Sequence, residues 1–315
     1  MRLKTCCMVM AALWLLMAGG AQAQVCNFAM TNINFGNINI GPGGTPSTTG
    51  TLTANCSGIA NRTITICPNI GDGTGGSASG SPRYLLNGAN TISYDLLQPN
   101  GQVWGSFVWP YAARAPILSL TLNGQGTGSL SQTVQAVISG SIASAPTGTY
   151  LSTYSAYHTL FDYGYAPGQN CSVVSTRATQ APFAVQAANV ATCNLSTTAM
   201  DFGTLSGLTT AQAATSQIGI TCTKGAAYVV SLSNGSNGGT GPTARKMAGA
   251  GGSISYGIYR DAAHAQPWGQ TTGTDTVSGI GTGLAQTVTA YGFLPAQGNP
   301  NPATYSDVVV VTVSY

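Results

Sequence analysis

The stretch "ATYSDVVVVTVSY" at residues 303–315 contains four consecutive valines flanked by threonine, serine and tyrosine, with no glycine or proline. This composition is typical of a well-buried β-strand. Val309, Val311 and Val313 alternate with Val308 and Val310, so we expect apolar contacts on both faces of the strand. Such a strand needs a neighbouring strand in its sheet. If the rest of the chain does not supply one, the strand is left at an unpaired edge of the sheet.

An internal repeat divides the chain into two similar copies. "CNFAMTNINFGNI" at 26–38 matches "CNLSTTAMDFGTL" at 193–205, and "GTYLSTYSAYHTL" at 148–160 matches the stretch at 303–315. Each copy has short alternating segments separated by glycine, asparagine and proline. This pattern predicts an all-β fold of two tandem immunoglobulin-like β-sandwich domains. We place the first domain at 24–185, a linker at 186–191 and the second domain at 192–315.

The first copy continues through residues 161–185, and the second copy has no counterpart of this segment. We expect residues 172–185 to form a final strand in the first domain, so the second domain lacks its final strand. Two interpretations remain open. A strand donated by another polypeptide completes the second domain, or the terminal strand is a tolerated sheet edge or is covered by another segment. If a strand is donated, the acceptor edge consists of Val309, Val311, Val313 and Tyr315.

The first 23 residues have the pattern of a secretory signal peptide, because Arg2 and Lys4 precede a short apolar core that ends at Ala21 and Ala23. We therefore expect an exported protein that begins near Gln24. Without Arg2 and Lys4, eight basic residues remain of the ten and balance seven acidic ones. This near-neutral charge argues against nucleic acid as a partner.

Six cysteines remain after the signal peptide, and an even number in an exported protein indicates disulfides. The repeat aligns Cys26–Cys56 with Cys193–Cys222, and elimination leaves Cys67–Cys171. Only two histidines and no glutamate are present, and no catalytic motif is recognisable. We therefore expect no metal, no cofactor and no enzymatic activity.

The motifs "CNF…NFG", "CNL…DFG", "ISYGIYRD…PWG" and the terminal stretch resemble the spore coat protein U domain family, found in subunits of archaic chaperone–usher pili. The resemblance implies incomplete pilin domains assembled through a periplasmic chaperone and an outer-membrane usher. The missing strand would come first from the chaperone and then from the next pilin subunit. Because only about two residues precede Cys26 in the exported chain, we expect it to accept a strand without donating one. This matches a two-domain tip adhesin at the cell surface.

Aromatic residues in glycine-rich and proline-rich loops are candidates for an exposed binding surface. Simple strand alternation places the segments 98–116 and 160–170 at the end of the first domain that points away from the linker. The first segment falls where copy one is about ten residues longer than copy two. The surface-binding candidates are Phe107, Val108, Trp109, Tyr111, Phe161, Tyr163 and Tyr165. Trp104 aligns with Trp268 and is interpreted as structural, and the same strand path conflicts with the Cys67–Cys171 pairing.

These observations predict a pilus tip subunit that attaches cells to an abiotic or host surface and promotes biofilm formation. A lectin-like tip is an alternative, in which the aromatic rings stack on sugars and Asp95, Asp162 and Asn170 bind hydroxyl groups. A structural, spore-coat-like surface protein is a further alternative.

Overall fold

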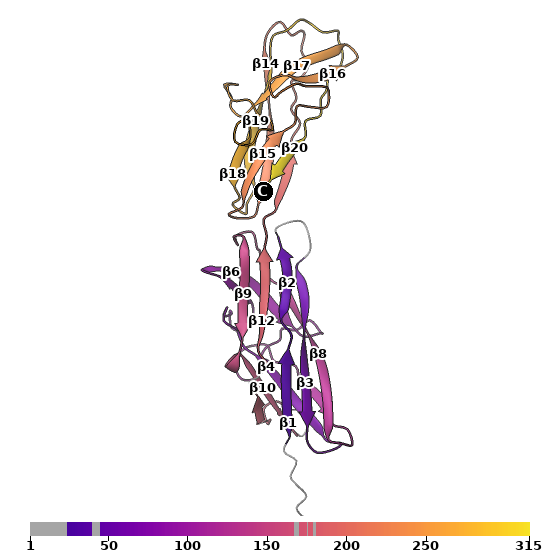
Figure 1. The fold of residues 1–315 in the computed structure, drawn as a ribbon, viewed down its shortest axis with the longest axis vertical. Coiled ribbons are helices and arrows are strands. Elements are labelled where there is room, and N and C mark those ends of the chain that lie inside the picture. The colour runs from indigo at the N-terminus through magenta and orange to yellow at the C-terminus, as the bar shows by residue number, and fades with distance from the viewer. Residues whose placement is uncertain (1–23, 40–44, 167–169, 175, 179–180) are drawn as a thin grey trace, which may run out of the picture.

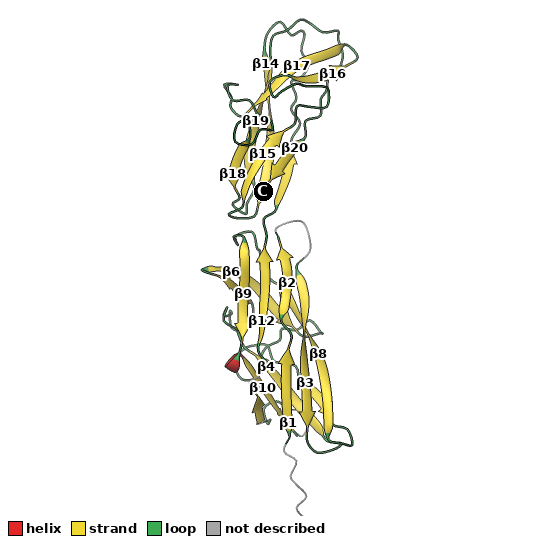
Figure 2. Cartoon of the chain, in the orientation of Figure 1, coloured by secondary structure: helices red, strands yellow, loops and turns green. Residues whose placement is uncertain are grey.

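The computed structural model describes residues 24–39, 45–166, 170–174, 176–178 and 181–315. The expected signal peptide at 1–23 lies outside the described residues. The described part folds into two β-sandwich domains placed end to end, with a single 3₁₀ turn, η1 (Ala156–His158), as its helical element (Figures 1 and 2). In this part of the chain, no helix has the length and apolar character needed to cross a membrane.

Domain one contains an eight-stranded sheet and a four-stranded sheet. The large sheet has the order β1-β3-β8-β6-β5-β9-β12-β2, and the small sheet has the order β11-β10-β4-β7. The strands are β1 (Val25–Met30), β2 (Ile33–Ile38), β3 (Ser47–Ser57), β4 (Thr63–Ile70), β5 (Arg83–Asn87), β6 (Asn90–Leu97), β7 (Leu118–Thr121), β8 (Thr127–Ile138), β9 (Gly148–Tyr154), β10 (Thr159–Gly164), β11 (Thr176–Ala178) and β12 (Phe183–Asn189).

Domain two repeats this arrangement with fewer strands, in sheets of order β13-β14-β19-β17-β16 and β18-β15-β20. Its strands are β13 (Cys193–Thr197), β14 (Gln212–Cys222), β15 (Ala227–Leu232), β16 (Arg245–Gly249), β17 (Gly252–Tyr259), β18 (Val277–Ile280), β19 (Gln286–Leu294) and β20 (Val311–Ser314). β20 pairs with β15 on one side and is an edge strand on the other. The domain therefore lacks a final strand among its described residues.

The predicted linker at 186–191 is longer than the linker in the structure. β12 continues to Asn189, because residues 186–189 pair with both β9 and β2. The amide of Val190 still donates to the carbonyl of Ile38, and the Thr223 hydroxyl donates to the carbonyl of Val190. Only residues 190–192 therefore connect the domains, and both domains hold them by hydrogen bonds.

An arginine and a tryptophan form the same buried pair in each domain. Arg83 is fully buried and donates to the carbonyls of Ile70, Gly71 and Trp104. Arg245, its counterpart, donates to the carbonyls of Leu232, Ser233, Pro242 and Trp268.

The tryptophans complete this pair. The indole of Trp104 donates to the carbonyl of Pro68, and the indole of Trp268 donates to that of Val230. Both tryptophans are fully buried. Trp104 is therefore structural, as the repeat indicated.

The three expected disulfides are confirmed: Cys26–Cys56, Cys67–Cys171 and Cys193–Cys222. The apparent conflict over Cys67 disappears because this residue lies in the middle of β4 and not at its end. β10 pairs antiparallel with β4 and places Asp162 opposite Cys67. The chain that follows β10 can therefore return to Cys67 within the same sheet.

Candidate functional site

Domain two contains an open groove of about 390 Å³. Residues 305–311, which lead into β20, form one wall, and residues 197–202 form the other. The floor consists of core side chains from four strands: Ile218, Leu232, Tyr256, Ile258 and Ala290. The groove thus exposes part of the domain core between two stretches of chain.

In domain one, β12 fills the corresponding place. This strand pairs antiparallel with β9 and parallel with β2. Its inward side chains Phe183, Val185 and Ala187 are buried, and the Phe183 ring stacks on Tyr154 at 4.4 Å between centroids. In domain two, residues 200–205, which correspond to β2 in the repeat, form no strand. Domain two therefore has both walls of the groove and, among its described residues, no strand between them.

The register of the two copies can be matched residue by residue along this wall. Leu86 of β5 bridges Leu151, and its counterpart Ala248 of β16 bridges Ser306. The next residues, Ser152 and Asp307, are therefore equivalent, and so are Tyr154 and Val309. The strand that completes domain one thus provides a template for the groove of domain two.

Asp307 is half-buried in the wall of the groove and accepts five hydrogen bonds. Its Oδ1 accepts from the amides of Ser236 and Val308, the Ser236 hydroxyl and the Asn237 side-chain amide. Its Oδ2 accepts from the Tyr256 hydroxyl at 2.8 Å. Burial, followed by this hydrogen bond, raises the pKa of Tyr256. Oδ1 therefore accepts four hydrogen bonds and Oδ2 accepts one. No pattern in the sequence indicated a role for Asp307.

Of the acceptor residues that the sequence indicated, Val309 and Val311 line this wall, whereas Val313 and Tyr315 lie beyond the groove lining and Tyr315 is 59 % exposed. Val309, Val311 and Val313 are half-buried against the core. Val308 and Val310 are 66 % and 58 % exposed, so the expectation of apolar contacts on both faces was wrong within this chain. The cause is the strict alternation of side chains in an edge strand, which turns one face to the core and the other outward.

Two of the surface-binding candidates belong to the core. Phe161 is fully buried, and Tyr163 is 5 % exposed. Both rings pack on Phe28, at 5.1 and 5.8 Å between centroids. The segment at 160–164 is not a loop but most of β10, and alternate residues of this strand point into the sandwich. Phe161 and Tyr163 are therefore excluded as surface contacts.

Tyr111 and Tyr165 are held by hydrogen bonds. Tyr111 is buried and donates its hydroxyl to Asp72, and burial together with this bond raises the pKa of Tyr111. The Tyr165 hydroxyl accepts from the amide of Ile59 at 2.6 Å, and Arg62 lies over its ring. Both tyrosines therefore support neighbouring loops, and Tyr165 keeps partial exposure.

The segment at 98–116 does not lie at the end of domain one opposite the linker. That distal end consists of the turns at 57–62 and 122–126, joined by a hydrogen bond from the amide of Gly58 to the carbonyl of Gly126. The segment follows Leu97, which pairs with Gln135, and instead contacts the opposite end of β4 at Asn69. The expectation of a distal position was wrong because β6 ends part-way along the domain.

The extra length of copy one is also divided between two places. Between Trp104 and Leu118 there are three more residues than between the equivalent Trp268 and Gly279, 14 steps against 11. Further extra residues lie in the β7–β8 turn, because Leu130 corresponds to Gln286 in the sheet register and not to Leu284. The segment at 98–116, which we call the aromatic loop, is therefore only a modest extension of a loop that both copies have.

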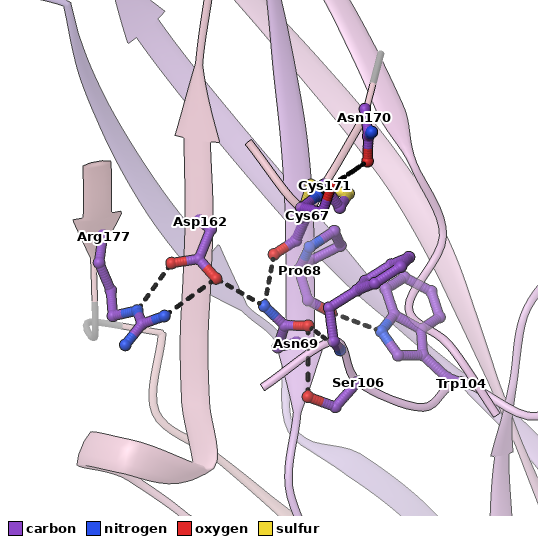
Figure 3. Close-up of a disulfide and its surroundings, with 11 residues drawn as sticks. Cys67, Pro68, Asn69, Trp104, Ser106, Asp162, Asn170, Cys171 and Arg177 are labelled. Carbon is purple, nitrogen blue, oxygen red and sulfur yellow. Dashed lines mark hydrogen bonds and ion pairs between the residues drawn. A yellow bond between two sulfur atoms is a disulfide. The ribbon is translucent and has the colours of Figure 1, made fainter. Parts of the chain in front are cut away.

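A buried polar network fixes the aromatic loop onto the small sheet (Figure 3). The Asn69 side chain donates to the carbonyl of Cys67 and to Asp162, and Asp162 forms an ion pair with Arg177 at 2.7 Å. The Oδ1 of Asn69 accepts from the Ser106 hydroxyl and from the amide of Phe107 at 2.7 Å. Asp162, a candidate for binding sugar hydroxyls, is thus engaged inside the domain.

Ser106 continues the network into the turn that follows. Its hydroxyl accepts from the amides of Val108 and Trp109, which holds the backbone of this turn. Phe107 is 36 % exposed, and Val108 and Trp109 are partly exposed. The turn therefore presents apolar side chains from a fixed backbone.

Trp109 belongs to a cluster of rings that the sequence did not reveal. Trp109 stacks on Tyr111 at 5.9 Å and contacts Tyr157 at 6.3 Å between centroids. Tyr157 lies in η1 and is 59 % exposed. The path from Tyr154 to Thr159 is three residues longer than the equivalent path from Val309 to Val311, so Tyr157 belongs to an insertion of copy one. We call Trp109 and Tyr157, together with Phe107 of the same turn as Trp109, the aromatic cluster.

His158 anchors the η1 side of this cluster. Its ring lies 4.1 Å from that of Tyr157, and its Nδ1 accepts from the amide of Gly73. Burial lowers the pKa of His158, which favours the neutral ring that can accept this bond. The Phe107 side of the aromatic cluster is therefore held by Asn69 near the end of β4, and the Tyr157 side is held through His158 by Gly73 just after β4.

Comparison with known proteins places the chain in a family. The family model described as the Spore Coat Protein U domain matches residues 13–156 and 179–312. The chain therefore belongs to the Spore Coat Protein U domain family and carries two copies of its domain. Protein U of Myxococcus xanthus is 33 % identical over 107 residues, which cover 32 % of this chain and 59 % of that protein. The match thus spans little more than half of that relative.

One solved structure shares the overall fold of this chain. One chain of the CsuC–CsuE chaperone–tip adhesion subunit pre-assembly complex, from archaic chaperone–usher Csu pili of Acinetobacter baumannii, is 15 % identical with a TM-score of 0.53. The alignment covers 92 % of this chain and 100 % of that one. The CupB6 tip adhesin of Pseudomonas aeruginosa is 11 % identical with a TM-score of 0.38, over 94 % and 96 % of the two chains. The second score is too low to support a structural inference.

Proposed function

We propose that this protein is the tip subunit of a chaperone–usher pilus, with domain one as the adhesive domain and domain two as the pilin domain. A periplasmic chaperone and then the next pilin subunit would fill the groove of domain two, and an outer-membrane usher would export the assembly. At the cell surface, domain one would attach the cell to abiotic or host surfaces and promote biofilm formation. The observation that carries this proposal is the groove, which is empty of described chain where domain one holds β12.

Strand donation explains the groove better than a tolerated edge does. The floor is apolar, and the backbone along 198–205 forms no sheet pairing on the groove side. A donated strand would supply main-chain hydrogen bonds to both walls and bury alternate apolar side chains. A buried backbone group without a partner costs about 1–3 kcal/mol, so leaving these walls open under a covering loop is unfavourable.

Hydrogen exchange tests strand donation. We expect the backbone amides of residues 199–202 and of Tyr305, Asp307 and Val309 to exchange rapidly in the protein alone and to become protected when the periplasmic chaperone or a pilin N-terminal peptide is bound. The amides of β14 and β19, which pair with each other along nine residue pairs, serve as the internal control. Equal protection of the two walls with and without a partner would contradict the proposal.

The aromatic cluster is our candidate for the adhesive surface. Phe107 and Tyr157 are exposed and Trp109 is partly exposed. The backbone of Phe107 and Trp109 is held by Asn69 and Ser106, and Tyr157 lies in an insertion that copy two lacks. Rigid aromatic rings contribute large contact areas with little loss of conformational entropy. Each ring buried at a surface contributes about 1.5–3 kcal/mol.

A triple substitution tests the adhesive role. We expect Phe107→Ser, Trp109→Ser and Tyr157→Ser together to reduce attachment of piliated cells strongly, while pilus number is unchanged. The control is Ile280→Ser with Leu284→Ser, which removes exposed apolar side chains from domain two. Normal attachment by the triple variant would exclude the cluster. Inhibition of wild-type attachment by free glycans would instead favour the lectin-like alternative.

A further inference from the structure

The strand that completes domain two must meet a carboxylate that domain one does not have. In domain one, Val185 of β12 pairs with Ser152 of β9, and both side chains are fully buried. The equivalent of Ser152 in the groove is Asp307, whose Oδ2 has the Tyr256 hydroxyl as its hydrogen-bond donor. Residues paired across antiparallel strands have Cβ atoms about 4.5–5.5 Å apart on the same face. The donated side chain that pairs with Asp307 therefore lies beside this carboxylate.

Docking of a strand changes the surroundings of Asp307. The groove now gives water access to the half-buried carboxylate, and an inserted strand removes that water. An ionised oxygen placed against an apolar side chain loses hydration without gaining a partner, which is strongly unfavourable. A hydroxyl or amide side chain at the same position would donate to Oδ2 and restore the lost bond.

We propose that Asp307 is a specificity-determining residue of the groove, which selects strands that carry a hydrogen-bond donor at the position paired with it. The proposal rests on the strand-donation function proposed above and adds a chemical requirement to the partner. By the β12 template, a large apolar residue lies two positions before the donor group, facing Val309, and a small residue lies two positions after it, facing Tyr305. The partner is therefore a β-strand with the inward pattern large apolar, polar donor, small.

Synthetic peptides based on the sequence of β12 test this requirement on the full-length protein. The first peptide has the sequence of Phe183–Asn189, FAVQAAN, with valine facing Asp307. The second, FATQAAN, replaces that valine with the nearly isosteric threonine. The third, FTVQAAN, carries threonine one position earlier, where it faces outward. Fluorescent labels at the peptide ends allow the dissociation constants to be measured by anisotropy.

We expect the second peptide to bind about tenfold more tightly than the other two, because a net gain of one hydrogen bond to a charged group has about this effect on a dissociation constant. A fourth peptide with aspartate at the paired position should bind most weakly, because it places two carboxylates together. Asp307→Ser restores the residue of domain one and should reduce the preference to less than about twofold. The peptide comparison on the wild-type protein stands on its own if this variant fails to fold.

The outcomes separate the two proposals. Equal binding of the valine and threonine peptides overturns the role of Asp307 and leaves strand donation intact. Failure of every peptide to bind, together with unprotected groove walls in the presence of chaperone, overturns both. If a folded Asp307→Ser variant still prefers the threonine peptide, another group in the groove must bind the threonine hydroxyl. This result would also overturn the role of Asp307.

Discussion

Arg83 and Arg245 show how single residues organise each sandwich. Each guanidinium is buried and donates to carbonyls from the strand before it and from the loop that carries the tryptophan. The fork of N–H groups suits this task because it reaches several acceptors from one rigid plane. Burial lowers the pKa of Arg245, and the nearby Tyr256, Asp307 and Asp275 oppose this effect. The side chain thus ties two loops to one point in the core.

Replacement of Arg83 by methionine should destabilise domain one by at least about 3 kcal/mol. The change keeps an apolar stem but leaves three buried carbonyls without their donor, and each such group costs about 1–3 kcal/mol. Urea unfolding of a 24–189 fragment measures the effect. Arg62→Met, which removes an exposed arginine, should change the free energy of unfolding by less than about 1 kcal/mol. Similar losses in both variants would refute this role of Arg83.

The sequence predicted some residues of the candidate site and missed others for physical reasons. Phe161 and Tyr163 are aromatic residues near glycines, as in a binding loop, and nothing local indicates that β10 turns them inward. Tyr157 lies far from Trp109 in the chain, and only the pairing of β10 with β4 brings the two rings together. The valines of β20 were identified because their alternation is itself visible in the sequence.

At the scale of elements, the two copies differ by one strand. β12 enters between β9 and β2 and turns β2 into a paired strand, whereas the equivalent residues 200–205 remain irregular. This difference was predictable because the repeat makes the absence visible by comparison. The exact end of β12 was not, because Gln186–Asn189 have no pattern that separates strand from linker. Pairing with β2 decides that boundary, and this pairing is a tertiary contact.

Charge placed on the inward face of β20 should prevent completion of domain two. Val311→Asp with Val313→Asp puts two carboxylates against the core, at a cost of several kcal/mol. We expect loss of the subunit from pili and its degradation in the periplasm, measured by immunoblotting of surface and periplasmic fractions. Val308→Asp with Val310→Asp changes the exposed face of the same segment and should be displayed normally. Equal display of both double variants would mean that the face of β20 does not govern assembly.

The Cys67–Cys171 disulfide should stabilise domain one more than the Cys26–Cys56 disulfide does. It closes a loop of 104 residues, against 30 for Cys26–Cys56. In the chain-entropy model the longer loop contributes about 4–5 kcal/mol and the shorter about 3–4 kcal/mol. We expect Cys67→Ala with Cys171→Ala to lower the melting temperature of domain one more than Cys26→Ala with Cys56→Ala does. The reverse order in calorimetry would show that local packing outweighs loop closure.

At the scale of the whole molecule, the two domains meet through short contacts around residues 190–192 (Figure 1). The amide of Thr147 in domain one donates to the carbonyl of Lys224 in domain two at 3.3 Å. The Asn189 side chain at the end of β12 donates to the carbonyls of Ala145 and Pro146 in the same loop. The strand that completes domain one therefore also holds the surface on which domain two rests.

The two domains should differ in their ability to fold alone. Domain one, residues 24–189, contains its own completing strand, two disulfides and a continuous core. Domain two, residues 190–315, leaves an apolar groove open along β20. We therefore expect domain one to be a soluble monomer with a cooperative unfolding transition, and domain two to aggregate or be degraded when it is exported without a partner.

Addition of the completing strand in cis provides the matched control for this experiment. Domain two extended at its C-terminus by a flexible linker and the peptide FATQAAN should become soluble and unfold cooperatively in calorimetry, because the strand buries the groove and pairs with both walls. The same extension with its three inward residues changed to aspartate should fail, since it places charges on the apolar floor. A soluble, cooperatively unfolding monomer of domain two with no extension would contradict the need for a donated strand. It would also remove the main support for a pilin role.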